Sequence, residues 1–276
     1  ESIAEIDADL DNVRIGWQWA INNRQVPLLL EMALAYWFYL DTKDFYQEGE
    51  ESFRRARLAA QAHVQKATPA VSEDEQRANE RLLAHMSTHE AYFVLRRVRL
   101  IEARTLLLPA IVLLQKHKEI TTLSMAQWHL GNTYWFHGDF ADAIQNYREA
   151  LAYSRQVGDL HRMLLMPMFI GGTLHVQGEY AEAYALLEEA VSGAQRLAVP
   201  RLLTYGIWCL SRTARLLGQS ETMLPLLHEG MQMTRATEDW FCVGLCLEEL
   251  AWIVFAEGDH ERAQSMLKES IELHQR

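Results

Sequence analysis

Apolar residues recur at helical spacing in blocks along the second half of this chain, and each block ends at a glycine. In the first of these blocks, Leu130, Tyr134 and Trp135 lie on one face of a predicted helix that ends before Gly138. Glycine accepts the left-handed conformation found just beyond a helix C-terminus, and the acidic Asp139 suits the start of a second helix. Each block therefore predicts two helices joined by a tight turn.

The blocks repeat with a fixed period of 40 residues, as the glycine positions 138, 178, 218 and 258 show. A small residue precedes each of these glycines in the same place. A constant period of this length is typical of a solenoid, in which each hairpin packs on its neighbours. The turn glycines are Gly138, Gly178, Gly218 and Gly258, and the small residues before them are Gly131, Gly171, Ser211 and Ala251.

A degenerate copy of the repeat precedes these units at residues 84–117. In this copy Val98 takes the place of the turn glycine, and Pro109 lies inside the second predicted helix, where a bend is expected. Pro167 and Pro225 raise the same expectation in later units. In the unit that contains Pro225, Met223 replaces an alanine, which predicts looser packing between its two helices.

Residues 124–157 resemble the tetratricopeptide repeat (TPR). The resemblance implies an all-α, TPR-like α-solenoid, a right-handed superhelix of about six helical hairpins. The family's usual period is about 34 residues, so the longer period predicts longer helices or looser turns between repeats. The residues that carry the resemblance are Leu130, Gly131, Tyr134, Gly138, Phe140, Ala143, Tyr147 and Ala150.

The predicted organisation is a single solenoid domain. It comprises an N-terminal entry helix (1–25), a divergent first hairpin (26–72), a degenerate TPR (73–117) and four TPR-like units with the 40-residue period (118–276). The chain begins at Glu1 and stops on the last helix of a repeat, which predicts a domain excised from a larger protein.

The N-terminal stretch resembles the entry to the helical arrays of bacterial STAND signalling ATPases, which include large LuxR-type and antibiotic-regulator-type transcriptional regulators. The resemblance implies a sensor domain that binds an effector in its concave groove and controls an upstream ATPase or output domain. The matching residues are Asp11, Asn12, Arg14, Trp19, Ala20, Trp37, Phe38, Tyr46, Glu48, Gly49, Phe53 and Ala56.

Composition and motifs narrow the function further. The net charge of −11 disfavours direct nucleic-acid binding, which needs a basic face. The sequence contains no GxxxxGK[ST] phosphate loop, GxGxxG turn or GxSxG elbow, so we expect no enzyme activity and no cofactor, with ATP confined to a parent domain outside this chain. No apolar run is long enough to span a membrane, and three cysteines form no disulfide framework, which together predict a cytoplasmic protein.

Two pairs of side chains have the spacing of one helical turn. His85 and His89 superficially offer a metal pair, but the HExxH pattern and a third ligand are absent, and exposed helical histidines are common. Cys242 and Cys246 are better explained by a packed helix face, because no second cysteine pair exists. We therefore predict no metal site.

The TPR resemblance also implies a binding surface, because in TPR arrays the first helix of each hairpin lines the concave face. Trp and Arg commonly anchor interfaces, and such a surface suits a peptide, a protein or a small effector with anionic and apolar groups. The lining residues it predicts are Tyr92, Arg96, Trp128, Asn132, Trp135, His175, Trp208, Arg212, Arg215, Trp252 and Phe255.

Alternatives remain open at this point. A register shift of one residue would place Trp128 or Trp208 in the core between helices instead of on the surface. A passive protein-binding scaffold without ligand-driven change competes with the sensor hypothesis, and a self-association module is a third interpretation.

Overall fold

The computed structural model describes residues 6–65 and 72–275, and every regular element within these ranges is a helix. The predicted all-α class is confirmed. Residues 1–5 of the predicted entry helix, residues 66–71 of the predicted first hairpin and residue 276 lie outside the described ranges. None of the described helices combines the length and the apolar character needed to cross a bilayer.

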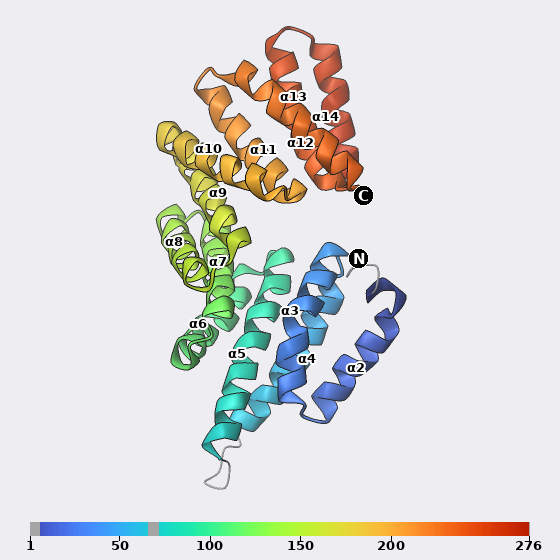
Figure 1. The fold of residues 1–276 in the computed structure, drawn as a ribbon, viewed down its shortest axis with the longest axis vertical. Helices are drawn as coiled ribbons and strands as arrows, with labels where there is room; N and C mark the ends of the chain where they lie inside the picture. Colours follow the sequence, from blue (N-terminus) through green and yellow to red (C-terminus); the bar gives the residue numbers. More distant parts are fainter. Residues whose placement is uncertain (1–5, 66–71, 276) are drawn as a thin grey trace. The chain divides into compact units, whose positions relative to one another are not determined.

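The chain divides into two compact units, residues 1–157 and residues 158–276, called unit 1 and unit 2 below. Both are built from antiparallel helical hairpins (Figure 1). The helices of unit 1 are α2 (Leu10–Asn22), α3 (Val26–Thr42), α4 (Tyr46–Gln65), α5 (Glu73–Arg96), α6 (Leu100–His117), α7 (Ile120–His137) and α8 (Phe140–Val157). Those of unit 2 are α9 (Leu160–Gln177), α10 (Tyr180–Leu197), α11 (Pro200–Leu216), the 3₁₀ turn η1 (Ser220–Met223), α12 (Leu224–Ala236), α13 (Trp240–Ala256) and α14 (His260–His274).

Left-handed residues separate the successive helices at a constant interval. From position 98 onward the residues with positive φ stand at 98, 118, 138, 158, 178, 198, 218, 238 and 258, so adjacent ones are 20 residues apart. The helices from α6 to α10 each contain 18 residues, and the links between them contain two. Longer helices, and not looser turns, therefore fill the 40-residue period. The glycine pattern locates only some of these links, because Val98, Lys118, Ala198 and Glu238 hold the left-handed conformation without being glycine.

Val98 is the most strained of these links, because β-branched residues rarely adopt its φ of 61°. Its side chain is 71% exposed and so gains little from packing. We expect Val98→Gly to raise the free energy of unfolding by about 0.5–1 kcal/mol, since relief of strain exceeds the extra entropy of glycine in the unfolded chain. Urea unfolding measures this change. The matched control, Gly138→Ala, introduces a side chain at a φ of 94° and should lower the free energy instead; a destabilised Val98→Gly protein would contradict the expectation.

The small residues of the repeat allow the two helices of a hairpin to approach closely. A Cβ atom added at Gly131 would lie 2.6 Å from the ring of Tyr147, and one at Gly171 would lie 2.6 Å from Cγ of Leu187. Both partner side chains are fully buried. The positions of these glycines are therefore set by helix packing and not by a turn.

The hairpin of α11 and α12 departs from the regular pattern. Met223 is buried and closes the short 3₁₀ turn η1, and α12 begins only at Leu224, with 13 residues. Pro225 stands in the first turn of α12, where a missing N–H costs nothing, so the bend expected there is wrong. Pro109 and Pro167, in contrast, do lie inside α6 and α9.

Candidate ligand-binding sites

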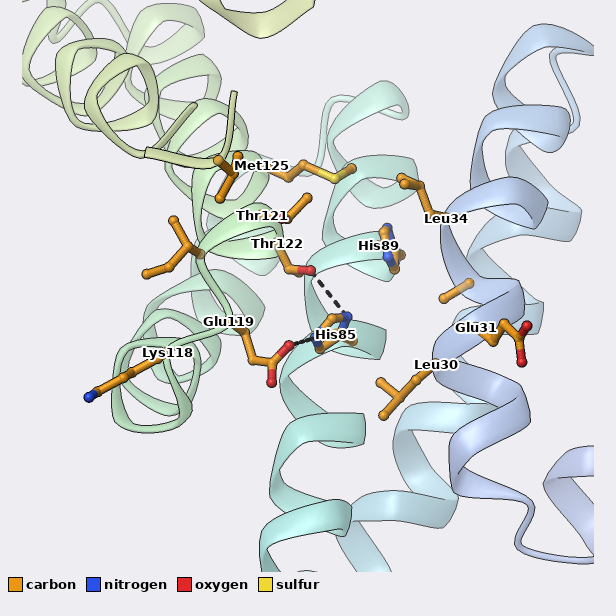
Figure 2. Close-up of a pocket in the computed structure, with 13 residues that line it drawn as sticks. Leu30, Glu31, Leu34, His85, His89, Lys118, Glu119, Thr121, Thr122 and Met125 are labelled. Carbon is orange, nitrogen blue, oxygen red and sulfur yellow. Dashed lines mark hydrogen bonds and ion pairs between the residues drawn. The ribbon is translucent and has the colours of Figure 1, made fainter. Parts of the chain in front are cut away.

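A cavity of about 460 Å³ lies between α3, α5 and α7, the first helices of the three hairpins of unit 1 (Figure 2). Its volume is within the range of small-molecule and side-chain pockets in proteins. The cavity forms because α5 packs against both α3 and α7. Its lining residues are Leu30, Glu31, Ala33 and Leu34 from α3, His85 and His89 from α5, Lys118, Glu119, Ile120, Thr121, Thr122 and Met125 from α7 and the link before it, and Val157.

The walls of the cavity are mainly apolar. Leu30 and Leu34 extend from α3 toward α5, and Met125 extends from the opposite side (Figure 2). Leu34 is 47% exposed although it is a large aliphatic residue, so it presents apolar surface to whatever enters the cavity. Lys118 points away from the cavity in the same view. Burial of an apolar group is therefore the main attraction that this site can offer.

A polar network fixes the floor of the cavity. His85 Nε2 lies 3.1 Å from Glu119 Oε2, and His85 Nδ1 lies 3.1 Å from Thr122 Oγ1. The His85 hydrogen bond, together with Arg81, lowers the pKa of Glu119 to about 2. Because the ionised carboxylate can only accept, His85 donates from Nε2 and the Thr122 hydroxyl can donate to Nδ1. The network holds the imidazole ring in one orientation at the base of the cavity.

Unit 2 carries a different surface, built from aromatic and arginine side chains of α11 and α13. The guanidinium carbon of Arg212 lies 4.6 Å from the ring centroid of Trp208, and that of Arg215 lies 5.0 Å from the ring centroid of Trp252. Such stacking orients a guanidinium group while leaving its N–H donors available. Trp252 remains 43% exposed, so it presents a large apolar face beside Arg215.

His175 from α9 belongs to the same surface. Its Nδ1 atom lies 3.1 Å from the hydroxyl of Thr213. Partial burial lowers the pKa of His175, and the positive charges of Arg212 and Arg215 lower it further. The imidazole is therefore neutral at neutral pH, and the positive charge of the surface comes from the two arginines.

A buried carboxylate, Glu249 of α13, lies beneath Arg215. Its side chain is 1% exposed, and Oε2 lies 3.4 Å from Arg215 Nε. Burial raises the pKa of Glu249, whereas Arg215 and then Arg212 oppose that rise. Arg215 thus compensates an internal charge and is only partly available to a ligand. The role of Glu249 is not evident from the sequence, because a glutamate is rarely buried and the adjacent Glu248 is less so.

Comparison with known proteins agrees with this architecture. Residues 126–157 match the tetratricopeptide repeat family. The chain contains a TPR and folds as a TPR-like helical array. No curated protein matches it.

Solved structures with the same fold include the apo form of RapI, with a TM-score of 0.61 and 12% identity over 87% of this chain and 97% of that chain. BtubC (BKLC) from P. vanneervenii is similar, with a TM-score of 0.61 and 16% identity over 86% and 91%. The Rap conjugation gene regulator of plasmid pLS20, solved in complex with the Phr* peptide, has a TM-score of 0.59 and 14% identity over 88% and 74%. At these identities the similarity establishes the TPR-like solenoid fold predicted from the sequence.

The residues predicted to line the groove are placed differently in the two units of the TPR array. In unit 2, His175, Arg212 and Arg215 are brought together, and Arg212 and Arg215 stack on Trp208 and Trp252. Phe255 is also exposed, with its ring centroid 6.1 Å from that of Trp252.

In unit 1, none of the predicted residues lines the cavity. Tyr92 is buried, donates a hydrogen bond to Asp41 and packs edge-on against Trp37 at 4.9 Å. Arg96 lies over the ring of Tyr46 and donates to its hydroxyl. These two side chains serve contacts between helices. The cavity lies nearer the N-terminal halves of α5 and α7 than the predicted positions do.

The remaining predicted positions of unit 1 lie on α7. Asn132 accepts a hydrogen bond of 2.8 Å from Tyr147 of α8. Trp128 packs beside His129 with ring centroids 4.9 Å apart, and Trp135 packs edge-on against Phe136 at 5.2 Å. The repeat pattern does not indicate the cavity, because Leu30 and Leu34 belong to the divergent first hairpin, which the 40-residue period does not reach.

The histidine and cysteine pairs also have defined surroundings. His89 is buried and His85 is half-buried, so their interpretation as exposed helical histidines is wrong. Among residues 6–65 and 72–275, no group of three or more His, Cys, Asp or Glu side chains is arranged to hold a metal ion. Cys242 and Cys246 are buried, as a packed helix face predicts, and burial raises the pKa of both thiols.

Proposed function

We propose that this chain is a non-enzymatic binding module, a TPR sensor domain of a STAND-type bacterial regulator that binds a peptide or another small effector. The cavity between α3, α5 and α7 carries the proposal, because it is a concave, largely apolar site with a fixed polar floor. The presence of the Phr* peptide in the structure of the pLS20 regulator, which has the same fold, supports a peptide as the ligand class. In this proposal an apolar side chain of the peptide enters the cavity.

The surface of unit 2 provides a second kind of recognition. Arg212 is stacked on Trp208 and has no ion pair among the described residues, so its guanidinium group can bind a carboxylate of the effector. Trp252 adds an exposed aromatic face. Together, Arg212 and Trp252 favour an effector in which an acidic group lies next to an apolar one. The net charge of −11 disfavours a nucleic acid as the partner.

Contacts within the N-terminal hairpins support the STAND part of the proposal. Arg14, from the Asp-Asn-x-Arg match, binds both oxygens of Glu48, from the Tyr-x-Glu-Gly match, at 2.7 and 2.6 Å. Gly49 follows directly, and a Cβ atom there would lie 2.6 Å from the ring of Phe93. Arg14, Glu48 and Gly49 thus take part in the packing between α2, α4 and α5. In this proposal the array passes effector binding to an upstream ATPase or output domain.

The function can be tested with peptides selected from a random phage-displayed library on the whole chain. We expect Leu34→Glu to weaken binding of a selected peptide at least tenfold, about 1.4 kcal/mol, because a carboxylate in the apolar wall opposes burial of the peptide side chain. Fluorescence anisotropy with a labelled peptide measures the dissociation constant.

The matched control is Leu58→Glu on α4. Leu58 is 50% exposed, close to the value for Leu34, but it does not line the cavity. Leu58→Glu adds the same negative charge as Leu34→Glu and should leave the affinity for the selected peptide unchanged. Equal affinities of the two variants, or a library that yields no peptide specific to this chain, would contradict the proposal.

The sensor and the passive scaffold differ in what binding does to the array. In a solenoid each repeat contacts only its neighbours, so a ligand that spans helices of adjacent hairpins can change their packing. We propose that the small-angle scattering profile changes when the selected peptide saturates the chain. Identical profiles would favour the passive scaffold.

A further inference from the structure

The exposed side of α6 in unit 1 carries a row of mainly apolar residues. We call Ile101, Thr105, Leu108 and Val112 the α6 stripe. Ile101, Leu108 and Val112 are 82%, 50% and 63% exposed. The spacing of the four residues follows i, i+4, i+7 and i+11, so they form one continuous line along the helix. The same spacing forms the contact line of paired helices in coiled coils.

The other hairpins show that this row is not required by the repeat. At positions shifted by multiples of 40 residues, the second helices carry charged, polar or small residues. The equivalents of Ile101 are Ala141, Ala181, Glu221 and Glu261, those of Leu108 are Arg148, Glu188, His228 and Lys268, and those of Val112 are Ala152, Ser192, Gln232 and Glu272. The packing of a hairpin therefore tolerates polar residues at these positions. The apolar residues of α6 call for a different explanation, and an interface is the usual one for an exposed apolar row.

We infer that the α6 stripe is a self-association surface, on which α6 packs antiparallel against α6 of a second copy of this chain. The charge of this face permits close approach of a second copy. The chain has a net charge of −11, which opposes close approach of two copies at most surfaces. The exposed residues of α6 include one acidic and one basic side chain, Glu102 and Lys116, so this face is neutral overall.

The positions of the two charges favour the antiparallel orientation. Glu102 and Lys116 lie along the same edge of the stripe and on opposite sides of Leu108 in the sequence. In an antiparallel pair with its twofold axis near Leu108, Glu102 of one copy faces Lys116 of the other, and the same contact occurs twice. In a parallel pair each of these residues would instead lie opposite its own copy. Each already has a partner within the chain, Arg99 for Glu102 and Glu80 for Lys116, so the added contact extends existing ion pairs.

A single helix stripe is smaller than a standard protein interface, so we expect a weak dimer in reversible equilibrium with the monomer. Sedimentation equilibrium from about 1 to about 500 µM should detect it, since affinities in this range suit small interfaces. Leu108→Arg, which introduces the residue found at the same position of α8, should weaken dimerisation at least tenfold.

The matched control is Leu58→Arg on α4. Leu58 and Leu108 are both 50% exposed leucines on second helices of unit 1, and both substitutions add one positive charge. Circular dichroism should show the same helix content for both variants. A wild-type chain that stays monomeric over the whole range, or a Leu108→Arg variant that dimerises as well as wild type, would overturn the inference.

Disulfide trapping tests the orientation independently. The three cysteines of the chain are buried, so an introduced surface cysteine is the accessible one. Leu108→Cys should form a disulfide-linked dimer under mild oxidation, because Leu108 lies at the proposed twofold axis. Gln115→Cys, near one end of the same face, should not form one. Equal cross-linking at both positions would indicate a parallel pair, and no cross-linking at Leu108→Cys would exclude the axis; either result overturns the arrangement.

Discussion

Replacement of Arg215 by glutamine should lower the free energy of unfolding by about 2–4 kcal/mol at neutral pH, because it leaves the buried Glu249 carboxylate without a positive partner. Glu249 is 1% exposed and Arg215 is 29% exposed, so the pair is shielded from water on the carboxylate side. This loss in the free energy of unfolding should not exceed the usual cost of breaking a fully buried ion pair. The reason is that the distance between Arg215 Nε and Glu249 Oε2 is 3.4 Å and that Arg215 is partly exposed to solvent.

The size of this loss should depend on pH in a defined direction. Burial already raises the pKa of Glu249 above the ordinary carboxyl value of 4.5, and Arg215 counteracts this effect. Without Arg215 the folded state holds the proton still more tightly than the unfolded state does. Because the folded state binds more protons than the unfolded state, the free energy of unfolding falls as the pH rises. The fall begins near the carboxyl pKa of the unfolded chain, about 4.5, and continues until the pH exceeds the raised pKa of the folded state. The variant should therefore be nearly as stable as wild type close to pH 4.5 and much less stable at pH 7.5.

Urea unfolding at pH 5 and pH 7.5 measures both effects. The double variant Arg215→Gln with Glu249→Gln removes the buried carboxylate as well as its positive partner. It should therefore recover most of the free energy of unfolding lost at pH 7.5, and it should lack the pH dependence that Glu249 causes in the single variant. A loss for Arg215→Gln that is the same at both pH values, or that the second substitution does not relieve, would contradict the role assigned to Glu249. The result also bears on the choice of binding variants: Arg212, which affects the pKa of Glu249 less than Arg215 does, is the safer position for testing ligand binding.

Two adjacent glycines of α9 should respond to alanine in opposite directions. A Cβ atom at Gly171 would lie 2.6 Å from Cγ of the fully buried Leu187, whereas one at Gly172 would have no atom within 4 Å. Gly171→Ala should lower the free energy of unfolding by about 1–2 kcal/mol, because overpacking outweighs the better helix propensity of alanine. Gly172→Ala should raise it by about 0.5–1 kcal/mol, because only the gain in propensity remains.

Each of these variants serves as the control for the other, since the substitution, the helix and the unfolded chain are the same. Thermal and urea unfolding give the two free-energy changes, and the difference between them should be about 1.5–3 kcal/mol. Changes of the same sign would show that Leu187 can move aside at little cost. Relief of the Gly171→Ala effect by Leu187→Ala would confirm that the contact with Leu187 is its cause.

The links between helices can be predicted from the sequence where a glycine occupies the position with positive φ. They cannot be predicted in this way where another residue occupies that position. Gly138 and Gly258 mark their links because glycine is the residue best suited to positive φ. Lys118 and Ala198 adopt the same conformation in regular links that no local preference indicates. Here the packing of hairpin against hairpin outweighs a backbone cost of about 1 kcal/mol, which no single-residue propensity can reveal.

The sequence likewise predicted the surroundings of some candidate site residues correctly and those of others incorrectly. The TPR resemblance placed Arg212, Arg215 and Trp252 on one surface, and unit 2 brings them together. It also placed Tyr92 on the groove, whereas the side chain is buried against Trp37, a residue of the divergent first hairpin. A periodic pattern indicates which face of a helix is apolar, but it does not show which residues pack against that face. In unit 1 the residue that packs against Tyr92 comes from the first hairpin, which does not follow the 40-residue period.

The sequence alone determined the all-α repeat architecture, the period and the helices that lie first in each hairpin, because these depend on residues a few positions apart within a hairpin and on their recurrence every 40 residues. The tertiary structure decided the partners: His85 with Glu119, Arg215 with Glu249, and the leucines that wall the cavity. These contacts join helices of adjacent hairpins, and a shift of a few ångströms or part of a turn between the hairpins would remove them. Burial, which sets the energy of such contacts, is likewise a property of the stacked hairpins and not of any one segment.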